Sequence, residues 1–261
     1  MSPSVRLFGT DREEILDLDS WFLHAPPEKG LAQWKDGYSA KEQAKAWLRP
    51  GRPAVPGEFW SAIAELVGDV DEVYGRPEHQ TRLDRYSRSR QHDLFGCARR
   101  DGATTQVIGV EAKACEDFDG IVADRAAAVA PSKKRARCNL LARALFGGGV
   151  LDEETGDILD SRLAGHGYQL WTAAVGTIIE AQKRGVVDAI VVVHQFRPDD
   201  VTGAKQAGDS RDWASALAAN AAAFNAFAQA LADAGSQSHE TEFVKPGTRL
   251  RLIKVESLIE R

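Results

Sequence analysis

Hydrophobic positions along the chain recur with helical spacing in some segments and with strand-like spacing in others. The predicted elements are a helix from residue 58 to about 68, strands at 71–75, 92–98 and 106–114, a helix at 168–184, a strand at 186–194 and a helix at 211–234. The turn signal Asp101-Gly102 predicts an antiparallel hairpin between the second and third strands. The almost uninterrupted apolar run VVDAIVVVH is typical of a strand that is covered on both faces.

The N-terminal part of the chain is predicted to form a helical arm that packs on the core, because its tryptophans would be costly to leave in water. A short helix is predicted at residues 39–48, with Ser39 as its N-cap and Glu42 three residues later. The connector PGRPAVPG follows at residues 50–57 and is stiffened by its prolines. The two predicted parts of the chain are therefore the arm, residues 1–55, and the main domain, residues 56–261.

Residues 115–167 are predicted to form an insert in the main domain that contains a basic helix. Ser132 is positioned as the N-cap of this helix, and Gly147 as its stop. Cys138 and Leu141 lie on its apolar stripe.

The C-terminal segment TRLRLIKVES alternates between polar and apolar residues, but its apolar set changes parity between Leu252 and Ile253. Since a shift of one residue turns the side chains to the other face of a sheet, a bulge or the end of an edge strand is expected there. The fold class predicted from all these segments is a three-layer α/β domain with a mixed central sheet, an N-terminal helical arm and a C-terminal helix plus strand.

The composition mainly excludes classes of protein. The three cysteines, Cys97, Cys115 and Cys138, are an odd number without close pairs, so reduced thiols are expected rather than disulfides or a zinc site. The chain contains no stretch of about 18 uncharged apolar residues, and its start lacks the apolar run of a signal peptide. A cytoplasmic protein without membrane contact is therefore expected.

The net charge of −5 argues against a protein that coats nucleic acid indiscriminately, because such binding depends on neutralising phosphates with Lys and Arg. Two basic stretches could still make local contacts. Residues 82–100 hold six arginines against two aspartates, and residues 133–143 hold five Lys or Arg and no acid. The alternative is that these charges form the solvated faces of a loop and a helix.

The strand-like segment QVIGVEAKA carries the candidate chemistry. Alternate residues of a strand share a face, so Glu111 and Lys113 are expected to point the same way. Asp93 lies on the partner strand of the hairpin, which can bring its carboxylate beside that of Glu111. Two converging carboxylates repel unless one takes up a proton or a cation lies between them. Mg²⁺, with Mn²⁺ as a substitute, suits such a site because one or two carboxylates plus a substrate phosphate usually hold it. The competing interpretation is an ordinary ion pair between Glu111 and Lys113.

The order of these residues resembles the PD-(D/E)XK nuclease superfamily. In this chain the motif reads His92-Asp93 followed by Glu111-Ala112-Lys113. The resemblance extends over about residues 58–194 and implies a restriction-endonuclease-like core, and the N-terminal PPEKGLAQWKDGYSAKEQAKAW is similar to the leader of an uncharacterised bacterial branch. By this resemblance, Asp93 and Glu111 bind the metal, while Lys113 positions or activates the attacking water and offsets charge on the phosphate.

The resemblance also implies further site residues. The first helix of the superfamily often adds a glutamate as a metal ligand, and Glu58 or Glu65 could serve here. Gln169 could contact the substrate through its amide. The candidate nucleic-acid contacts of the basic helix are Lys133, Lys134, Arg135 and Arg137. One departure from the superfamily's pattern is that Gln91-His92 replaces the usual proline before the aspartate.

Two functional classes remain open from the residues alone. The first is a metal-dependent nuclease that hydrolyses phosphodiester bonds, with DNA as the expected substrate in defence, restriction or repair. The second is a catalytically inactive module with the same sheet, which binds nucleic acid or protein. A homodimer or a partner protein is compatible with either class. The chain has no P-loop, G-x-G-x-x-G, G-x-S-x-G or H-E-x-x-H motif, which excludes the commonest nucleotide-binding, serine-hydrolase and zinc-protease classes.

Overall fold

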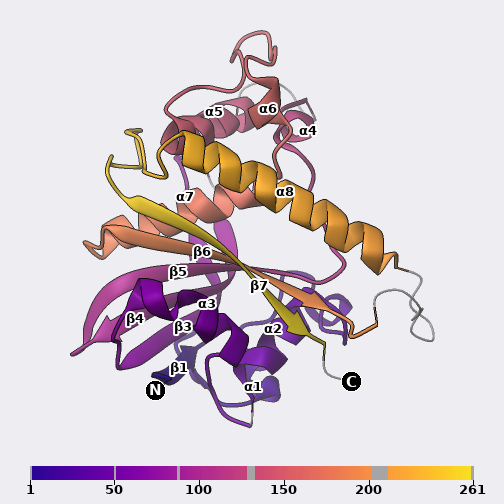
Figure 1. Ribbon diagram of the computed structural model, residues 1–261, viewed down its shortest axis with the longest axis vertical. Coiled ribbons are helices and arrows are strands. Elements are labelled where there is room, and N and C mark those ends of the chain that lie inside the picture. Colours follow the sequence, from indigo (N-terminus) through magenta and orange to yellow (C-terminus); the bar gives the residue numbers. More distant parts are fainter. Residues whose placement is uncertain (1, 50, 87–88, 128–132, 201–210, 260–261) are drawn as a thin grey trace.

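A mixed β-sheet forms the centre of the computed structural model, which describes residues 2–49, 51–86, 89–127, 133–200 and 211–259 (Figure 1). Within these residues the sheet has seven strands in the order β2-β1-β3-β4-β5-β6-β7. The strands are β1 (Ser4–Phe8), β2 (Glu14–Ile15), β3 (Glu72–Thr81), β4 (Arg90–Arg100), β5 (Ala103–Lys113), β6 (Asp188–Arg197) and β7 (Arg249–Leu258). The predicted α/β class with a mixed sheet is confirmed.

Helices cover both faces of the sheet. They are α1 (Leu18–His24), α2 (Ser39–Trp47), α3 (Gly57–Val67), α4 (Val122–Ala127), α5 (Lys133–Phe146), α6 (Ser161–Ala164), α7 (Tyr168–Lys183) and α8 (Trp213–Asp233), with a short 3-10 helix, η1 (Gly30–Ala32). Figure 1 shows α1, α2 and α3 on one side of the sheet and α5, α7 and α8 on the other. In the part of the chain that the structure describes, no helix is long and apolar enough to cross a membrane.

The two faces of the sheet bury separate hydrophobic clusters. Phe59 and Ile63 of α3 pack with Val110 of β5 in one cluster. Trp171 of α7 and Phe227 of α8 belong to the other. We call the side of the sheet with the first cluster the α3 face and the side with the second cluster the α7 face. The alternation of side chains along each strand decides on which face a residue lies.

The predicted hairpin is present and joins β4 to β5. Asp101 and Gly102 have φ values of 51° and 76°, the left-handed conformations that a tight hairpin turn requires. On its other edge β4 pairs antiparallel with β3, whereas β5 pairs parallel with β6 after the chain has crossed through α7. This arrangement places the C-terminal end of β5 beside the first residues of β4 and α7.

The sequence pattern predicted a helical N-terminal arm, but the structure also has two strands there. Strands β1 and β2 extend the sheet beyond β3. The helix predicted at residues 39–48 is present as α2, but its cap differs. Tyr38 occupies the N-cap position, and the hydroxyl of Ser39 donates instead to Glu116. The carboxylate of Glu42 accepts the backbone N–H of Gly37 at 2.8 Å.

The C-terminal strand β7 lies at the edge of the sheet, as predicted, but it has no bulge. Its pairing with β6 continues in one register from Arg249 to Leu258. Leu252 and Ile253 are both half-buried, so the change of parity reflects partial cover on both faces and not a break in the ladder. The cap predicted at Ser132 falls outside the described residues, while Gly147 ends α5 with a φ of 77°.

Candidate active site

Strands β4 and β5 part beside Asp93. Their ladder runs from the turn as far as the pair Leu94 and Val110. Beyond it, Asp93 Oδ2 accepts the backbone N–H of Ala112 at 2.7 Å. A side-chain carboxylate thus satisfies a backbone donor of β5 beyond the end of the β4–β5 ladder, and this bond fixes the carboxylate between the two strands. Continued by one residue past Leu94 and Val110, the register brings Asp93 level with Glu111.

A third carboxylate lies at the same level on the next strand. The pairs Pro77–Leu94 and His79–His92 of β3 and β4 flank Glu78 and Asp93, so these two residues lie at the same level. Glu78 has a φ of 54°, in the left-handed region, and its carboxylate accepts a hydrogen bond from Gln91. Glu78, Asp93 and Glu111 therefore form a carboxylate row across three adjacent strands.

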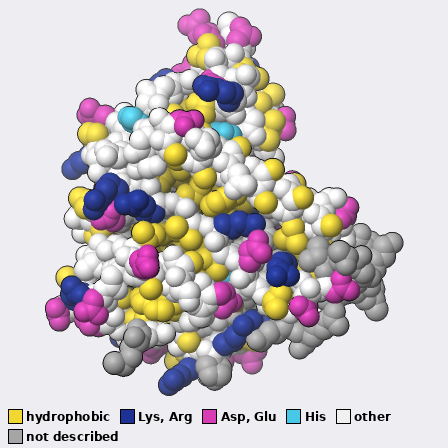
Figure 2. All heavy atoms as spheres, in the orientation of Figure 1, with side chains coloured by type: hydrophobic (Ala, Val, Ile, Leu, Met, Phe, Trp, Pro, Cys, Tyr) yellow, Lys and Arg dark blue, Asp and Glu magenta, His cyan; other side chains and the backbone are white. Residues whose placement is uncertain are grey.

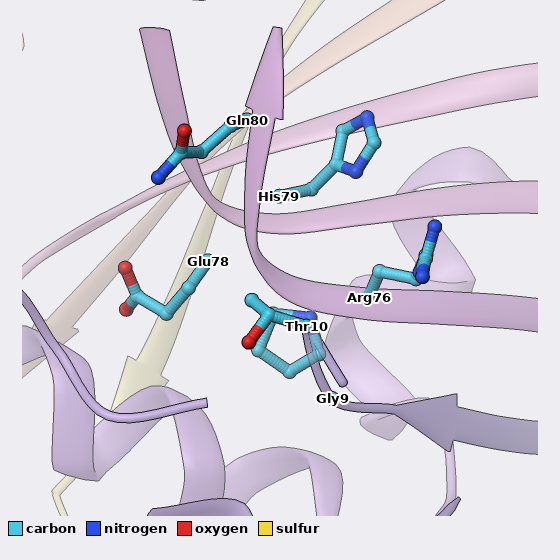
Figure 3. A pocket seen from close by; sticks show the side chains of 7 residues that line it. Gly9, Thr10, Arg76, Glu78, His79 and Gln80 are labelled. Carbon is cyan, nitrogen blue, oxygen red and sulfur yellow. The ribbon is translucent and has the colours of Figure 1, made fainter. Parts of the chain in front are cut away.

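Glu78 also lines a cavity at the edge of this row. The cavity has a volume of about 210 Å³, and its walls come from residues 9–10 after β1 and residues 76–80 of β3. In Figure 3 the Glu78 carboxylate and the Arg76 side chain point away from each other on the two sides of Thr10. A cavity of this size has room for several water molecules beside Glu78.

Two cations hold the carboxylate of Glu111. Lys113 Nζ lies 2.8 Å from Glu111 Oε1, as expected for two residues on the same side of β5. Arg90 Nη2 contacts the other oxygen, Oε2. Lys113 also donates to Gln169 Oε1 of α7 at 2.8 Å. Glu111 and Lys113 are 1% and 5% exposed, so this charged group lies almost wholly under α7.

The pKa values of the row reflect burial and mutual repulsion. Burial, followed by the charge of Glu111, raises the pKa of Asp93 to about 7. Burial and the charge of Asp93 raise the pKa of Glu78 well above its ordinary value. Burial opposes ionisation of Glu111 too, but Arg90 and Lys113 outweigh it and lower the pKa of that carboxyl. Ionisation of all three carboxyls would place three negative charges beside two cations, and the raised pKa values of Asp93 and Glu78 reflect the resistance to that state.

A divalent cation would favour ionisation of these carboxyls by compensating their mutual repulsion. No group of three His, Cys, Asp or Glu side chains forms a ready metal site among the described residues. Mg²⁺ needs fewer protein ligands than that, because it keeps several waters and binds through one or two carboxylates plus a phosphate. Asp93 and Glu111 can supply two such carboxylates, and they lie near enough for the charge of Glu111 to raise the pKa of Asp93.

The structure does not bring Glu58, the predicted additional metal ligand, into the row. It lies at the start of α3 and contacts the hydroxyl of Ser257 on β7. Ser257 also bonds His194 Nε2 at 2.7 Å, and His194 packs against Phe59 on the α3 face of the sheet. Glu58 is thus directed to the opposite face from Glu111. Glu65 lies on the exposed side of α3.

Three other polar residues, His194, Glu116 and Asp117, have structural roles. Burial lowers the pKa of His194 to about 3, so the ring is neutral and serves as a hydrogen-bonded sheet residue. Glu116 Oε2 accepts the N–H of Ala114 at 2.7 Å, and Asp117 accepts that of Asp119 at 2.9 Å. These acidic residues after the motif shape the turn that leaves β5.

The basic helix α5 is only partly available to nucleic acid. Lys133 and Lys134 are exposed. Arg135 donates to the carbonyl of Glu154 at 3.1 Å. Arg137 makes two hydrogen bonds to Asp84, of 2.5 and 2.9 Å, and Asp84 is 1% exposed. Of the four predicted phosphate contacts, Arg137 therefore neutralises a buried carboxylate, and Lys133 and Lys134 are the exposed ones.

Replacing Arg137 by Ala is expected to lower the free energy of unfolding by about 3 kcal/mol or more, because Asp84 would stay buried without its partner. Lys134→Ala is the matched control, since it removes an exposed cation of the same helix and should change stability by less than about 0.5 kcal/mol. Urea unfolding of the two variants and the wild type measures the difference. Equal midpoints for the three proteins would show that the Arg137–Asp84 pair contributes nothing.

On the face shown in Figure 2, the Lys and Arg side chains of the described residues lie singly or in small groups among acidic and apolar ones. This surface matches the acidic net charge of −5 and does not form a continuous basic strip. Contacts with phosphates on this face would be local.

Comparison with known proteins gives one match. A family model described as "Domain of unknown function (DUF6946)" matches residues 14–258. No curated protein and no solved structure matches the chain.

Proposed function

The chain belongs to the DUF6946 family, whose description assigns no activity, and we propose from the site itself that it is a metal-dependent nuclease that hydrolyses phosphodiester bonds in DNA. The observation that carries the proposal is the convergence of Asp93, Glu111 and Lys113 where β4 and β5 part. An ordinary ion pair does not explain why a second and a third carboxylate lie at the same level of the sheet.

The order of elements supports the same proposal. Helix α3, the antiparallel strands β3, β4 and β5, helix α7 and the parallel strand β6 follow one another along the chain. This order resembles the restriction-endonuclease-like core, in which the corresponding second and third strands carry the motif. Asp93 stands near the start of β4, and Glu111 and Lys113 stand at the end of β5.

Each residue has a definable part in the proposed reaction. Bound Mg²⁺ would lower the pKa of a water and polarise the phosphoryl oxygen. Asp93 and Glu111 would hold the ion. Lys113, oriented by Gln169, would stabilise negative charge that develops on the phosphate. Glu111 and Asp93 also keep the pKa of Lys113 above its ordinary value although burial opposes its charge, so Lys113 acts as a cation.

The alternative is a catalytically inactive module that binds nucleic acid or protein. One observation favours it: Glu111 and Lys113 are almost fully buried, and both oxygens of Glu111 already contact a cation. A structural ion pair of Glu111 and Lys113 would show the same burial and the same contacts. Cleavage assays separate the two functions, because an inactive module binds but does not cut.

Incubation of supercoiled, linear and single-stranded DNA and of RNA with the purified chain tests the proposal. Each substrate is exposed to Mg²⁺, Mn²⁺ or EDTA. Cleavage of DNA that requires the metal supports the nuclease, and preferential cleavage of RNA would correct the substrate class. Binding without cleavage under every condition would establish the inactive module instead.

If the exposed end of α5 contacts DNA, replacing Lys133 and Lys134 together by Ala should weaken binding and reduce the dependence of affinity on salt. Each lost phosphate contact lowers the slope of log K against log salt by about 0.9, so a decrease of up to about 2 is expected. The control is the double variant Lys29→Ala and Lys35→Ala, whose exposed lysines lie near η1. A fluorescence titration in which both double variants keep the wild-type slope would remove α5 from the interface.

A further inference from the structure

Arg90 is a buried cation whose hydrogen bonds are incomplete. Its guanidinium contacts Glu111 Oε2 through Nη2, and its side chain is 9% exposed. Its Nε atom is buried without a hydrogen-bond partner in the described part of the chain. A buried donor without an acceptor is costly, which suggests that Arg90 has another partner in a different state of the protein.

The surroundings of Arg90, which lies beside the carboxylate row, also differ from those of Lys113. Arg90 is the cation whose charge favours ionisation of all three carboxylates, Glu78, Asp93 and Glu111. Lys113 is tied to helix α7 by Gln169 and lies 5.5 Å from the ring of Phe118, so its position is fixed from two sides. Of the two cations at Glu111, Arg90 is therefore the one whose place another cation can take.

We propose that Arg90 responds to metal binding at this site, changing its partner when a divalent ion is bound; this proposal rests on the proposed function. While no divalent ion is bound, it neutralises Glu111. With a divalent ion held by Asp93 and Glu111, Arg90 would release Oε2 of Glu111, and its guanidinium would donate to a phosphate of the substrate. The planar donor set of arginine suits this second role, because it matches the geometry of phosphate oxygens better than a lysine ammonium does.

Binding of Mn²⁺ alone to Arg90→Gln tests the proposal without any cleavage assay. Because the competing cation is gone, isothermal titration calorimetry should give a dissociation constant about tenfold lower than that of the wild type. The matched control is Arg184→Gln, which removes an arginine from buried Glu180 outside the site and should leave the Mn²⁺ affinity unchanged. Equal or weaker Mn²⁺ binding by Arg90→Gln, with the control at wild-type affinity, overturns the proposal.

Thermal unfolding covers the case in which Arg90→Gln folds poorly, because the variant leaves buried carboxylates without their cation. Its Tm in EDTA should lie below that of the wild type, and saturating Mn²⁺ should raise it by more than it raises the wild-type Tm. A smaller or equal increase would contradict the proposal. Arg184→Gln should lose stability as well, but Mn²⁺ should not restore it preferentially.

Arg90→Lys tests the second role. It keeps the charge, so its Mn²⁺ affinity should stay within about threefold of the wild type, whereas the KM for cleavage should rise about tenfold because a single ammonium replaces the planar fork. An unchanged KM would overturn the phosphate contact. If the wild type binds Mn²⁺ but cuts no nucleic acid, the proposed function fails, and the ratio of Mn²⁺ affinities still decides whether Arg90 responds to metal.

Discussion

Replacing Lys113 by Ala is expected to lower the rate of Mg²⁺-dependent cleavage about a hundredfold or more, the scale that the loss of one electrostatic stabiliser has in other active sites. Lys113 would act mainly on charge that develops during the reaction, so binding should change much less than turnover. Substrate affinity measured in Ca²⁺, in which the variant and the wild type are compared without cleavage, should stay within about threefold.

The control for this variant is Lys183→Ala, which removes a lysine from Glu180 on the same helix that orients Lys113. It should cut at the wild-type rate. Circular dichroism establishes that Lys113→Ala remains folded, which is expected because Arg90 still neutralises Glu111. A folded Lys113→Ala variant that cuts as fast as the wild type would leave Lys113 and Glu111 as a structural pair.

Replacing Asp93 by Asn is expected to weaken Mn²⁺ binding and to lower cleavage about a hundredfold, while it stabilises the metal-free protein at alkaline pH. The pKa of Asp93 is about 7 in the folded chain, against an ordinary value of 3.8, so the folded chain binds this proton more tightly than the unfolded chain. Stability that is present at acidic pH is therefore lost as the pH rises toward and through 7. Asn cannot ionise and should not show this loss.

Thermal unfolding in EDTA at pH 4.5 and pH 8 measures the effect. The difference in Tm, Asp93→Asn minus wild type, should be larger at pH 8 than at pH 4.5. The amide oxygen of Asn can still accept the backbone N–H of Ala112, so the strand contact is kept. A constant difference between the two proteins at both pH values would show that the ionisation of Asp93 does not oppose folding.

Local periodicity was sufficient to predict the central elements of the fold. The hairpin followed from Asp101-Gly102 and from two strands of suitable length, and the side shared by Glu111 and Lys113 followed from alternation. Counting residues across the hairpin then brought Asp93 level with Glu111. These inferences depend only on interactions between segments that are close in the chain, and the structure bears them out.

The third carboxylate could not be predicted in this way. The strand pattern weakens after residue 75, because Pro77 lacks a backbone donor and Glu78 adopts a left-handed conformation that disturbs alternation. Strand β3 nevertheless continues to Thr81, because its pairing with β4 extends as far as Thr81 and Arg90. Glu78 enters the carboxylate row through this long-range pairing, which no local pattern reports.

Charge patterns were the least reliable guide. Arg90 and Arg137 both lie in basic stretches that predict phosphate contacts, yet each neutralises a carboxylate that is 1% exposed. Glu58 begins the expected helix, but that helix packs on the α3 face of the sheet and carries Glu58 away from Glu111. The role of a charged residue depends on which element packs against it, and that packing is decided by the tertiary fold and not by the local sequence.

The most direct test of the central claim is a comparison of the wild type with Glu111→Gln on supercoiled DNA. The substitution keeps the shape of the side chain and removes the charge on which the proposed metal site depends. In Mg²⁺ the wild type is expected to nick the DNA, EDTA to abolish nicking, and Glu111→Gln to be slower by about a hundredfold or more. If the wild type leaves the DNA intact in both Mg²⁺ and Mn²⁺, or if Glu111→Gln nicks it at the wild-type rate, the row of carboxylates does not form the active site of a nuclease.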